Sequence, residues 1–364
     1  MPPVDLMDKK WMRVALGLAH RGLGQIAPNP AVGCVLLKDH IVIGRGWTQP
    51  GGRPHAETEA LGQAGASAHG ATAYVTLEPC AHTGKTPPCA MALVNSGVQR
   101  VVIAASDPDP RVSGKGISVL QSAGIEVVQG ILEKEATYLN RGFFNRINQN
   151  RPTFTLKTAS TLDGKIALAN GESKWITGER ARTYGHLMRS EHDGILVGAN
   201  TVIADDPSLT CRIPGLETRS PIRIVLDSDL RISPDAAIFS KDIGDQPTLV
   251  VTKKDARTKA FNGCNVEFIH VETPHDLGLV ARALSERGLN SILIEGGSQV
   301  AASFLSANLV DDLCVFSAGK LIGNNGLSAV GDLNLVSLPD APHFTPIANR
   351  RLGPDMLATY RKAR

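Results

Sequence analysis

One histidine, one glutamate and two cysteines in the first quarter of the chain have types and spacings that suit metal chemistry. His55 and Glu57 are separated by one alanine, and Cys80 and Cys89 each follow a proline. An imidazole and two thiolates are ligands that zinc prefers, and a catalytic zinc site keeps its fourth position for water. Such an ion lowers the pKa of that water and yields a hydroxide able to attack an amine-bearing ring carbon. The pattern predicts a hydrolytic zinc site with His55, Cys80 and Cys89 as its ligands.

Glu57 is not needed as a ligand, and its carboxylate can carry protons. It can take a proton from the water and return it to the ring nitrogen and the departing ammonia. Taken singly, Cys80 and Cys89 could be small apolar residues of a core, the common state of free cysteine, and His55 could simply begin a helix. Taken together they favour a metal site. His82 is a rival ligand, but we expect it to lie beside the site or contact the substrate, because three ligands are already supplied.

Apolar periodicity predicts the elements that position these four residues. A helix of about 15 residues is expected from Leu6 onward, followed by a hairpin over residues 31–37 and 41–47. A glycine- and proline-rich loop then brings His55 to the start of a helix that ends near Gly65. Cys80 follows a buried strand over residues 71–77, and Cys89 follows a proline at a helix start. Further strands are expected at 98–105 and 125–128, with a helix at 116–124 between them.

The alternation of strands and helices continues beyond residue 150. A helix is expected over residues 132–148, and an Asn-Arg-Pro break follows it, so we predict domains at 1–150 and 151–364. The second half shows strand patterns at 153–159, 194–197, 222–226, 248–251 and 291–294, and helical patterns at 179–191 and 275–287. Residues 229–270 show no clear pattern.

Composition limits the classes of function that are open to the chain. The 364 residues are 42% hydrophobic and 20% charged, as in globular proteins. A formal charge of +3 and an aromatic content of 4% argue against a nucleic-acid or membrane surface and fit a small anionic substrate. No segment reaches the roughly 18 apolar residues that span a bilayer, and the N-terminus lacks a signal-like apolar run. Six cysteines do not suggest a disulfide framework, so we expect a cytoplasmic location.

A glycine pair, Gly296 and Gly297, stands between the strand at 291–294 and a helix start at Ser298. Such a turn exposes backbone N–H groups at the positive end of a helix, where a phosphate can approach closely. The segment lacks the G-x-G-x-x-G dinucleotide fingerprint, and a plain tight turn is the commoner meaning of two glycines. By itself the pattern indicates a nucleotide only weakly.

Two sets of motifs resemble one family. Zinc-dependent nucleobase deaminases carry H-x-E…P-C-x-x-C, but here eight residues separate Cys80 from Cys89. This longer interval, with His82, Lys85 and a Thr-Pro-Pro run, resembles the deaminase half of the bifunctional riboflavin-biosynthesis deaminase-reductase. Segments 157–164, 171–177 and 197–210 resemble the reductase half of the same enzyme. The resemblance covers nearly the whole chain, with the deaminase first.

The resemblance implies a fold and two reactions. The fold would be a cytidine-deaminase-like α/β/α domain with a mixed sheet, then a dihydrofolate-reductase-like α/β domain. The first would deaminate 2,5-diamino-6-(5-phosphoribosylamino)pyrimidin-4-one with one Zn²⁺ per site. The second would use NADPH to convert the ribosyl group of the product uracil into a ribityl group. The implied partners are these phosphorylated pyrimidines, without nucleic acid or membrane, and a homo-oligomer, by base rates a dimer.

The resemblance also implies contact residues. For NADPH they are Ala159, Trp175, Thr201, Asp205, Ser228, Gly297, Ser298, Gln299, Val300, Ala301, Ala302 and Ser303. For the pyrimidine of the reductase they are Ser173, Arg189, Leu209, Arg212 and Glu295, and for that of the deaminase Asn29, His82, Lys85 and Asp107. An arginine pair suits a phosphate monoester, although Arg189 and Arg212 could equally be solvated surface residues, as could Lys85. Lys157 and Asp205 are open alternatives for a general acid of the reduction.

Two other functions are compatible with parts of the pattern. The chain could be a nucleic-acid-editing deaminase with an appended binding domain, but its near-neutral charge and few aromatic residues argue against this. Alternatively, zinc could be a structural staple of an interaction protein. That alternative gives Glu57 no purpose, and a structural site would have a fourth protein ligand.

Overall fold

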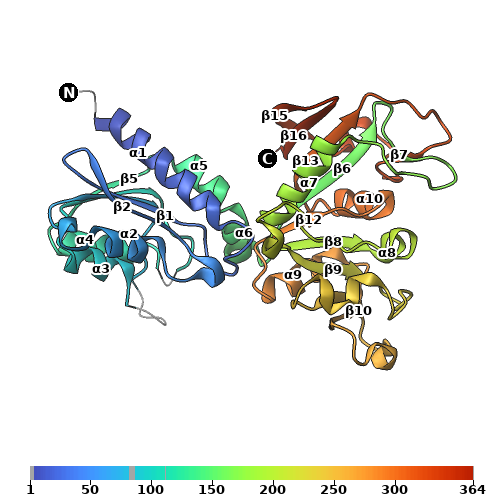
Figure 1. The fold of residues 1–364 in the computed structure, drawn as a ribbon, viewed down its shortest axis with the longest axis horizontal. Coiled ribbons are helices and arrows are strands. Elements are labelled where there is room, and N and C mark those ends of the chain that lie inside the picture. Colours follow the sequence, from blue (N-terminus) through green and yellow to red (C-terminus); the bar gives the residue numbers. More distant parts are fainter. Residues whose placement is uncertain (1–3, 82–86, 111, 364) are drawn as a thin grey trace. The chain divides into compact units, whose positions relative to one another are not determined.

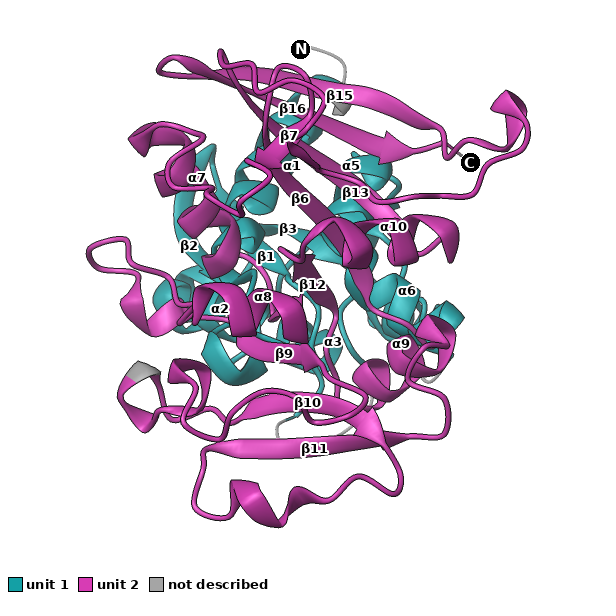
Figure 2. Cartoon of the chain, turned by 90° about the vertical axis from the view of Figure 1, so that its right-hand side faces the viewer, with its two compact units in different colours: residues 1–149 teal, residues 150–364 magenta. Residues whose placement is uncertain are grey.

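The computed structural model describes residues 4–81, 87–110 and 112–363. The chain divides into two compact units, Met1–Gln149 and Asn150–Arg364, which are coloured separately in Figure 2. The division lies beside the break at Asn150-Arg-Pro. Each unit has its own sheet and its own buried apolar cluster.

The described part of the first unit forms a five-stranded mixed sheet. Its order is β2-β1-β3-β4-β5, with antiparallel pairing of β1 to β2 and β3 and parallel pairing from β3 through β5. The strands are β1 (Gly33–Lys38), β2 (Ile41–Trp47), β3 (Thr72–Leu77), β4 (Arg100–Ala105) and β5 (Glu126–Gln129). This confirms the predicted hairpin and the predicted mixed sheet.

Helices cover both faces of this sheet (Figure 1). One face carries α1 (Val4–Ala19) and α5 (Glu133–Leu139), and the other carries α2 (Ala56–Ala64), α3 (Cys89–Asn95) and α4 (Lys115–Ser122). The predicted starts of α2 and α3 are confirmed, since His55 and Pro88 are their N-cap residues. Two of the predicted ligand positions therefore lie at the beginnings of neighbouring helices.

The single helix predicted over residues 132–148 is wrong, because Asn140 divides it into α5 and α6 (Arg141–Gln149). The Asn140 side chain accepts a hydrogen bond from the backbone N–H of Ala31 at 2.7 Å and donates one to the carbonyl of Ala31 at 2.9 Å. Asparagine readily exchanges helical geometry for such backbone contacts. The kink thus holds the loop that carries Asn29.

The described part of the second unit forms a nine-stranded sheet in the order β11-β10-β9-β8-β12-β6-β13-β16-β15. Pairing is parallel from β11 to β13 and antiparallel at the β13-β16-β15 end. The strands are β6 (Thr153–Thr161), β8 (Gly194–Gly198), β9 (Ile222–Leu226), β10 (Thr248–Lys253), β11 (Val266–Val271), β12 (Ser291–Ile294), β13 (Val310–Ala318), β15 (Phe344–Leu352) and β16 (Asp355–Lys362). A separate ribbon pairs β7 (Lys165–Ala167) with β14 (Leu327–Ser328).

The helices of the second unit are α7 (Glu179–Ser190), α8 (Ala199–Asp205), α9 (Leu277–Glu286) and α10 (Ser298–Ser306). All five predicted strands and both predicted helical patterns are confirmed. The pattern did not reveal α8, β11 or the strands after residue 310. In the core, Phe304 of α10 packs on Phe154 of β6, with ring centroids 5.0 Å apart, and this contact seats α10 against the sheet.

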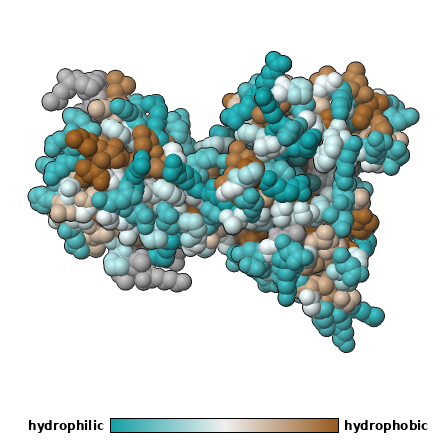
Figure 3. All heavy atoms as spheres, viewed as in Figure 1, coloured by the Kyte–Doolittle hydropathy of each residue, from teal (hydrophilic) through white to brown (hydrophobic). Residues whose placement is uncertain are grey.

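The visible faces of both units are mainly hydrophilic, with apolar side chains in separate patches (Figure 3). Among the described residues, no helix combines the length and the hydropathy that crossing a membrane would require.

Replacement of Asn140 by alanine tests the link between the helix kink and the loop at Ala31. Asn140→Ala leaves two buried backbone groups without their partner, so the unfolding free energy of the first unit should fall by about 2 kcal/mol. Urea denaturation followed by circular dichroism measures this. Asn148→Ala, at an exposed position of α6, is the matched control, and an equal effect of both changes would contradict the assignment.

Candidate zinc centre and reductase cavity

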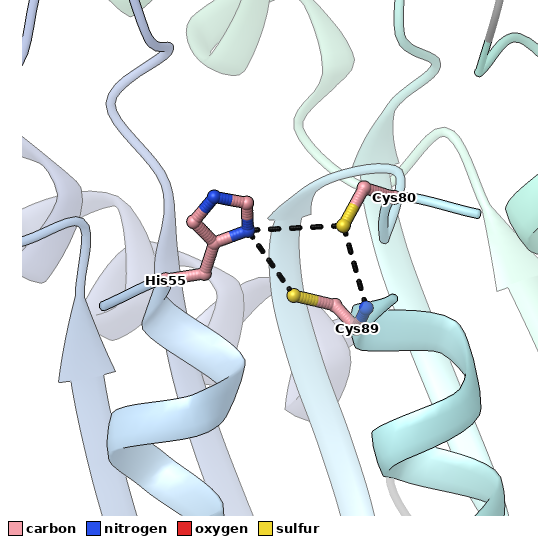
Figure 4. A group of neighbouring side chains, drawn as sticks. All are labelled: His55, Cys80 and Cys89. Atoms are coloured by element: carbon pink, nitrogen blue, oxygen red, sulfur yellow. Dashed lines mark hydrogen bonds between the residues drawn. The ribbon is translucent and has the colours of Figure 1, made fainter. Parts of the chain in front are cut away.

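The side chains of His55, Cys80 and Cys89 converge in the first unit, as Figure 4 shows. Nδ1 of His55 lies 3.2 Å from Sγ of Cys89 and 3.7 Å from Sγ of Cys80. The backbone N–H of Cys89 donates to Sγ of Cys80 at 3.3 Å. All three ligand atoms lie within 4.8 Å of one another. The α2 start, the loop after β3 and the α3 start each supply one of them.

This donor set fits zinc. Zinc binds thiolate at about 2.3 Å and imidazole at about 2.0 Å in a tetrahedron, so the ligand atoms of such a site lie about 3.5 to 3.8 Å from one another. The hydrogen bond from Cys89 lowers the pKa of Cys80 to about 4, and His55 adds to this shift. A thiolate, the form that binds metal, is therefore available at neutral pH.

Glu57 lies in the first turn of α2 and is 3% exposed. Burial raises the pKa of Glu57 to about 7, and negative charge on Cys80 adds to this shift. A carboxyl group whose pKa is near neutrality can both accept and release a proton, which is the requirement for a general acid and base. Glu57 lines the same cavity as His55 and Cys80.

The cavity has a volume of about 260 Å³ and includes two of the predicted substrate contacts, Asn29 and Asp107. Burial raises the pKa of Asp107 to about 6, and the nearby carboxylate of Asp109 adds to this shift. His82 and Lys85, the other two predicted contacts, lie outside the described residues. The cavity is further lined by residues that the pattern did not single out, among them Arg53, Glu78, Asp109 and Arg146. Arg53 lies two residues before His55, Glu78 directly follows β3, and Asp109 lies two residues after Asp107. Their nearness along the chain to predicted site residues is the signal that could have identified them.

Glu78 holds the loop that carries Cys80. It is 3% exposed, and its carboxylate accepts hydrogen bonds from the backbone N–H groups of Gly114 and Gly116, each at 3.0 Å. These groups belong to the start of α4, where the helix dipole favours a negative charge. The position of Cys80 is thereby tied to α4 as well as to β3.

Gly52 shapes the cavity wall through a close approach to Asn29. Its φ angle is 82°, and a Cβ at this position would lie 1.8 Å from Nδ2 of Asn29. Only glycine leaves that amide where it is.

A second cavity, of about 730 Å³, lies in the second unit at the ends of β8, β9 and β12. Most of the predicted NADPH contacts line it, namely Thr201, Ser228, Gly297, Ser298, Gln299, Val300 and Ser303. Gly297 is the N-cap of α10, so the helix begins at the cavity wall. A Cβ at Gly198 or at Gly296 would lie 2.8 Å or 2.6 Å from the Val300 side chain, and both loops therefore pack directly on Val300.

The structure does not bring the other predicted NADPH contacts to this cavity. Ala301 and Ala302 are 0% and 6% exposed and face the core, because they lie on the inner side of α10. Asp205 is exposed at the end of α8, and Ala159 lies half-buried on β6. Trp175 is 61% exposed, with the Arg182 guanidinium 4.5 Å from its ring centroid.

Three charged side chains meet at the C-terminal end of β12. Glu295 bonds to Nε and Nη2 of Arg189 at 2.9 and 3.1 Å and to Nζ of Lys157 at 3.4 Å. Burial alone would raise the pKa of Glu295, but the two cations outweigh it and hold this pKa well below its usual range. Arg189 thus already has a carboxylate partner.

The remaining predicted contacts of the reductase substrate differ in their exposure to solvent. Leu209 is 4% exposed and packs in the apolar cluster with Phe239, so its side chain is turned away from solvent. Arg212 is exposed and contacts His186 at 3.4 Å. Ser173 is half-buried in the loop before α7.

Comparison with known proteins decides the family. Residues 6–105 match the cytidine and deoxycytidylate deaminase zinc-binding region, and residues 152–358 match the RibD C-terminal domain. The chain is 42% identical to the riboflavin biosynthesis protein RibD of Aquifex aeolicus, over 98% of this chain and 99% of that protein. RibD of Escherichia coli is 41% identical, over 96% and 98% of the respective chains. The chain belongs to the RibD family.

Solved structures of RibD proteins agree over the full length. RibD of Acinetobacter baumannii has a TM-score of 0.88 at 36% identity, covering 99% of both chains. A diaminohydroxyphosphoribosylaminopyrimidine deaminase/5-amino-6-(5-phosphoribosylamino)uracil reductase from Thermotoga maritima has a TM-score of 0.87, also at 36% identity and 99% coverage of both. The predicted fold class is confirmed, and the alternative of an appended nucleic-acid-binding domain is wrong, because a RibD reductase domain occupies that region.

The family assignment settles the type of protein. It is a bifunctional enzyme of riboflavin biosynthesis that combines a zinc-dependent deaminase with an NADPH-dependent reductase.

Gly52→Ala tests whether Asn29 must keep its position in the deaminase cavity. The added Cβ would displace the Asn29 amide, so ammonia release should slow by about tenfold or more, the equivalent of about 1.4 kcal/mol in the barrier. Bound zinc, measured by atomic absorption, should not change. Gly51→Ala is the matched control, because Gly51 also has a positive φ angle, 75°, but has no atom within 4 Å of the added Cβ. Equal losses in both variants would attribute the effect to backbone strain.

Proposed function

We propose that the cavity of the first unit deaminates 2,5-diamino-6-(5-phosphoribosylamino)pyrimidin-4-one. His55, Cys80 and Cys89 would hold the zinc ion, and Glu57 would carry the protons. The convergence of three N and S donors beside a buried carboxyl group carries this proposal. The substrate is the one named for the Thermotoga maritima relative, which is similar along the whole chain.

The protein's own residues have defined tasks in this hydrolysis. Zinc, when bound, supplies Lewis-acid activation of water at neutral pH. The carboxylate of Glu57 accepts a proton from the attacking water as the C–O bond forms at C2, while the π electrons of the C2–N bond move to the ring nitrogen, which receives that proton from Glu57. Glu57 then moves the hydroxyl proton of the new C–OH group to the amine on C2, so that ammonia leaves as the C–N bond breaks and the C=O bond forms. Asn29 and Asp107, which line the cavity, would contact the ring. His82 and Lys85, which lie outside the described residues, would also contact the substrate.

We propose that the cavity of the second unit binds NADPH, with its diphosphate at the start of α10. Backbone N–H groups at a helix N-terminus suit an anion, and seven predicted contacts line this one cavity. NADPH supplies hydride when bound. The substrate would lie near Arg189 and Glu295, and Lys157 would donate a proton to the ribose oxygen as its bond to C1′ breaks. Lys157 is preferred to Asp205 because it lies in this charged cluster, whereas Asp205 is exposed at the end of α8.

Domain function, location and assembly complete the proposal. Residues 1–150 would perform the deamination and 151–364 the reduction, in keeping with the two matched regions. A cytoplasmic location is supported by six cysteines that form no disulfide. A homodimer is the assembly favoured by general frequency.

Glu57→Gln separates proton transfer from metal binding. The variant should retain about one zinc per chain, as three ligands predict, and should release ammonia about 100-fold to 10,000-fold more slowly, the usual range for loss of a general acid and base. Zinc is measured by atomic absorption and ammonia by a coupled assay. His55→Ala is the comparison that should lose zinc, whereas His82→Ala should keep it. Retained turnover in Glu57→Gln would remove Glu57 from its role.

Ser298→Trp tests the cofactor cavity. An indole at the first residue of α10 would occupy the space of the diphosphate, so the affinity for NADPH should fall by about tenfold or more, the equivalent of losing about 1.4 kcal/mol of binding. Binding is measured by NADPH fluorescence, and oxidation of NADPH by the deaminated substrate should fall with it. Ser306→Trp, at the exposed opposite end of α10, is the control. Unchanged binding in Ser298→Trp would place the cofactor elsewhere.

A further inference from the structure

One end of the second unit's cavity carries three charged or titratable side chains, Asp229, Arg231 and His275, to which the proposed function above gives no role, beside the predicted NADPH contact Ser228. Ser228, Asp229 and Arg231 follow the C-terminal end of β9, and His275 lies in the loop before α9; all four line the cavity. Gly297 and Ser298, where the diphosphate would bind, line the same space. If the diphosphate of a dinucleotide binds at the N-terminus of α10, another part of the dinucleotide would therefore lie near the C-terminal end of β9.

Arg231 is held at the cavity wall by hydrogen bonds that run to α10. Its Nη1 donates to Oδ1 of Asn200 at 2.9 Å, and Nδ2 of Asn200 donates to Oε1 of Gln299 at 3.2 Å. All three residues line the cavity. The Arg231 side chain is 53% exposed, and its Nη2 donates to none of the described residues. A guanidinium edge is thus oriented and accessible to a ligand.

Two acidic side chains flank Arg231, and both have other partners. Asp229 forms an ion pair with Lys253, Oδ1 to Nζ, at 2.8 Å. Lys253 lowers the pKa of Asp229, and the charges of Arg231 and His275 add to this shift. Asp227 is 1% exposed at its side chain and accepts a hydrogen bond from the backbone N–H of Ile232 at 3.0 Å, while its Oδ1 lies 4.0 Å from Nε of Arg231. Asp227 is therefore buried behind the arginine, and Lys253 offsets the charge of Asp229.

In α/β folds that carry the G-x-G-x-x-G fingerprint, which this chain lacks, the type of residue beside the adenosine ribose distinguishes two cofactors. A free carboxylate near the end of the strand bonds the ribose 2′-hydroxyl of NADH, whereas a nearby arginine accommodates the 2′-phosphate of NADPH. A planar guanidinium also binds phosphate through two parallel, charge-assisted hydrogen bonds. An accessible arginine beside a neutralised aspartate corresponds to the second case.

We infer that Arg231 recognises the 2′-phosphate of NADPH and thereby gives the reductase its preference over NADH. The inference rests on the proposed cofactor site in this cavity. Asn200 and Gln299 position the guanidinium, and the pairing of Lys253 with Asp229 reduces the repulsion that a phosphate would meet.

Titration calorimetry with adenosine 2′,5′-bisphosphate and adenosine 5′-monophosphate tests this in the full-length protein. Both probes carry the adenosine and the 5′-phosphate, and only the first carries the 2′-phosphate. In Arg231→Gln the affinity for the bisphosphate should fall about 10- to 100-fold, as expected for loss of charge-assisted hydrogen bonds. The affinity for the monophosphate should change little, and Arg231→Lys should restore part of the loss.

Two further variants are informative, one expected to raise the affinity for the bisphosphate and one expected to leave it unchanged. Asp229→Asn removes the negative charge beside the phosphate and should strengthen bisphosphate binding. Arg287→Gln removes another arginine of the second unit, which pairs with Glu267 away from the cavity, and should leave both affinities as in the wild type. Thermal melting confirms that each variant folds.

The outcomes separate this inference from the proposed cofactor site. If the wild type binds NADPH, Ser298→Trp weakens it and Arg231→Gln leaves the ratio of the two probe affinities unchanged, the role of Arg231 is refuted and the cavity stands. If the wild type binds NADPH but Ser298→Trp has no effect, the cavity is not the cofactor site and the inference fails with it.

Discussion

The buried carboxylate of Glu78 is the contact on which the zinc centre depends. The backbone N–H of Glu78 donates to the carbonyl of Ala105 in β4 at 2.9 Å, and its carboxylate accepts hydrogen bonds from the backbone N–H groups at the start of α4. Cys80 follows two residues later, so its position relative to β3 and α4 is set before any metal binds. With α2 and α3 delivering His55 and Cys89 from their N-termini, three flexible side chains start from three rigid elements. Preorganisation of this kind reduces the entropy lost when the ion is bound.

The sequence allowed good prediction of elements that are defined by local pattern. The periodicity of α1, the hairpin around residue 39 and the helix starts at His55 and Pro88 all come from nearest neighbours along the chain. The division at Asn140 could not be predicted in this way, because its cause is Ala31, which is 109 residues away. β11 and the strands after residue 310 were missed for a related reason. Their burial comes from the neighbours they acquire in the nine-stranded sheet.

The candidate sites also differ in whether their residues are grouped by local sequence pattern or by contacts between distant segments. Motif spacing was sufficient to select His55, Glu57, Cys80 and Cys89, which lie together at two helix starts and a strand end. For the reductase, the glycine pair pointed to the helix that begins at the wall of the second cavity, but Ala301 lies on the inward face of α10 and is buried in the core. The ion contacts of Glu295 with Lys157 and Arg189 join residues that are 138 and 106 positions apart. Only the assembled sheet brings them together, so type and spacing alone could not reveal the contacts.

Val300 has a consequence for how this family can vary. Its side chain fills the space that a Cβ at Gly198 or Gly296 would need, so three positions on three separate segments share one small volume. At Gly198 the added Cβ would meet Cγ2 of Val300, which alanine at position 300 would remove, whereas at Gly296 it would meet Cβ of Val300, which every residue except glycine has. Related chains should therefore change position 198 together with position 300, and should keep glycine at position 296.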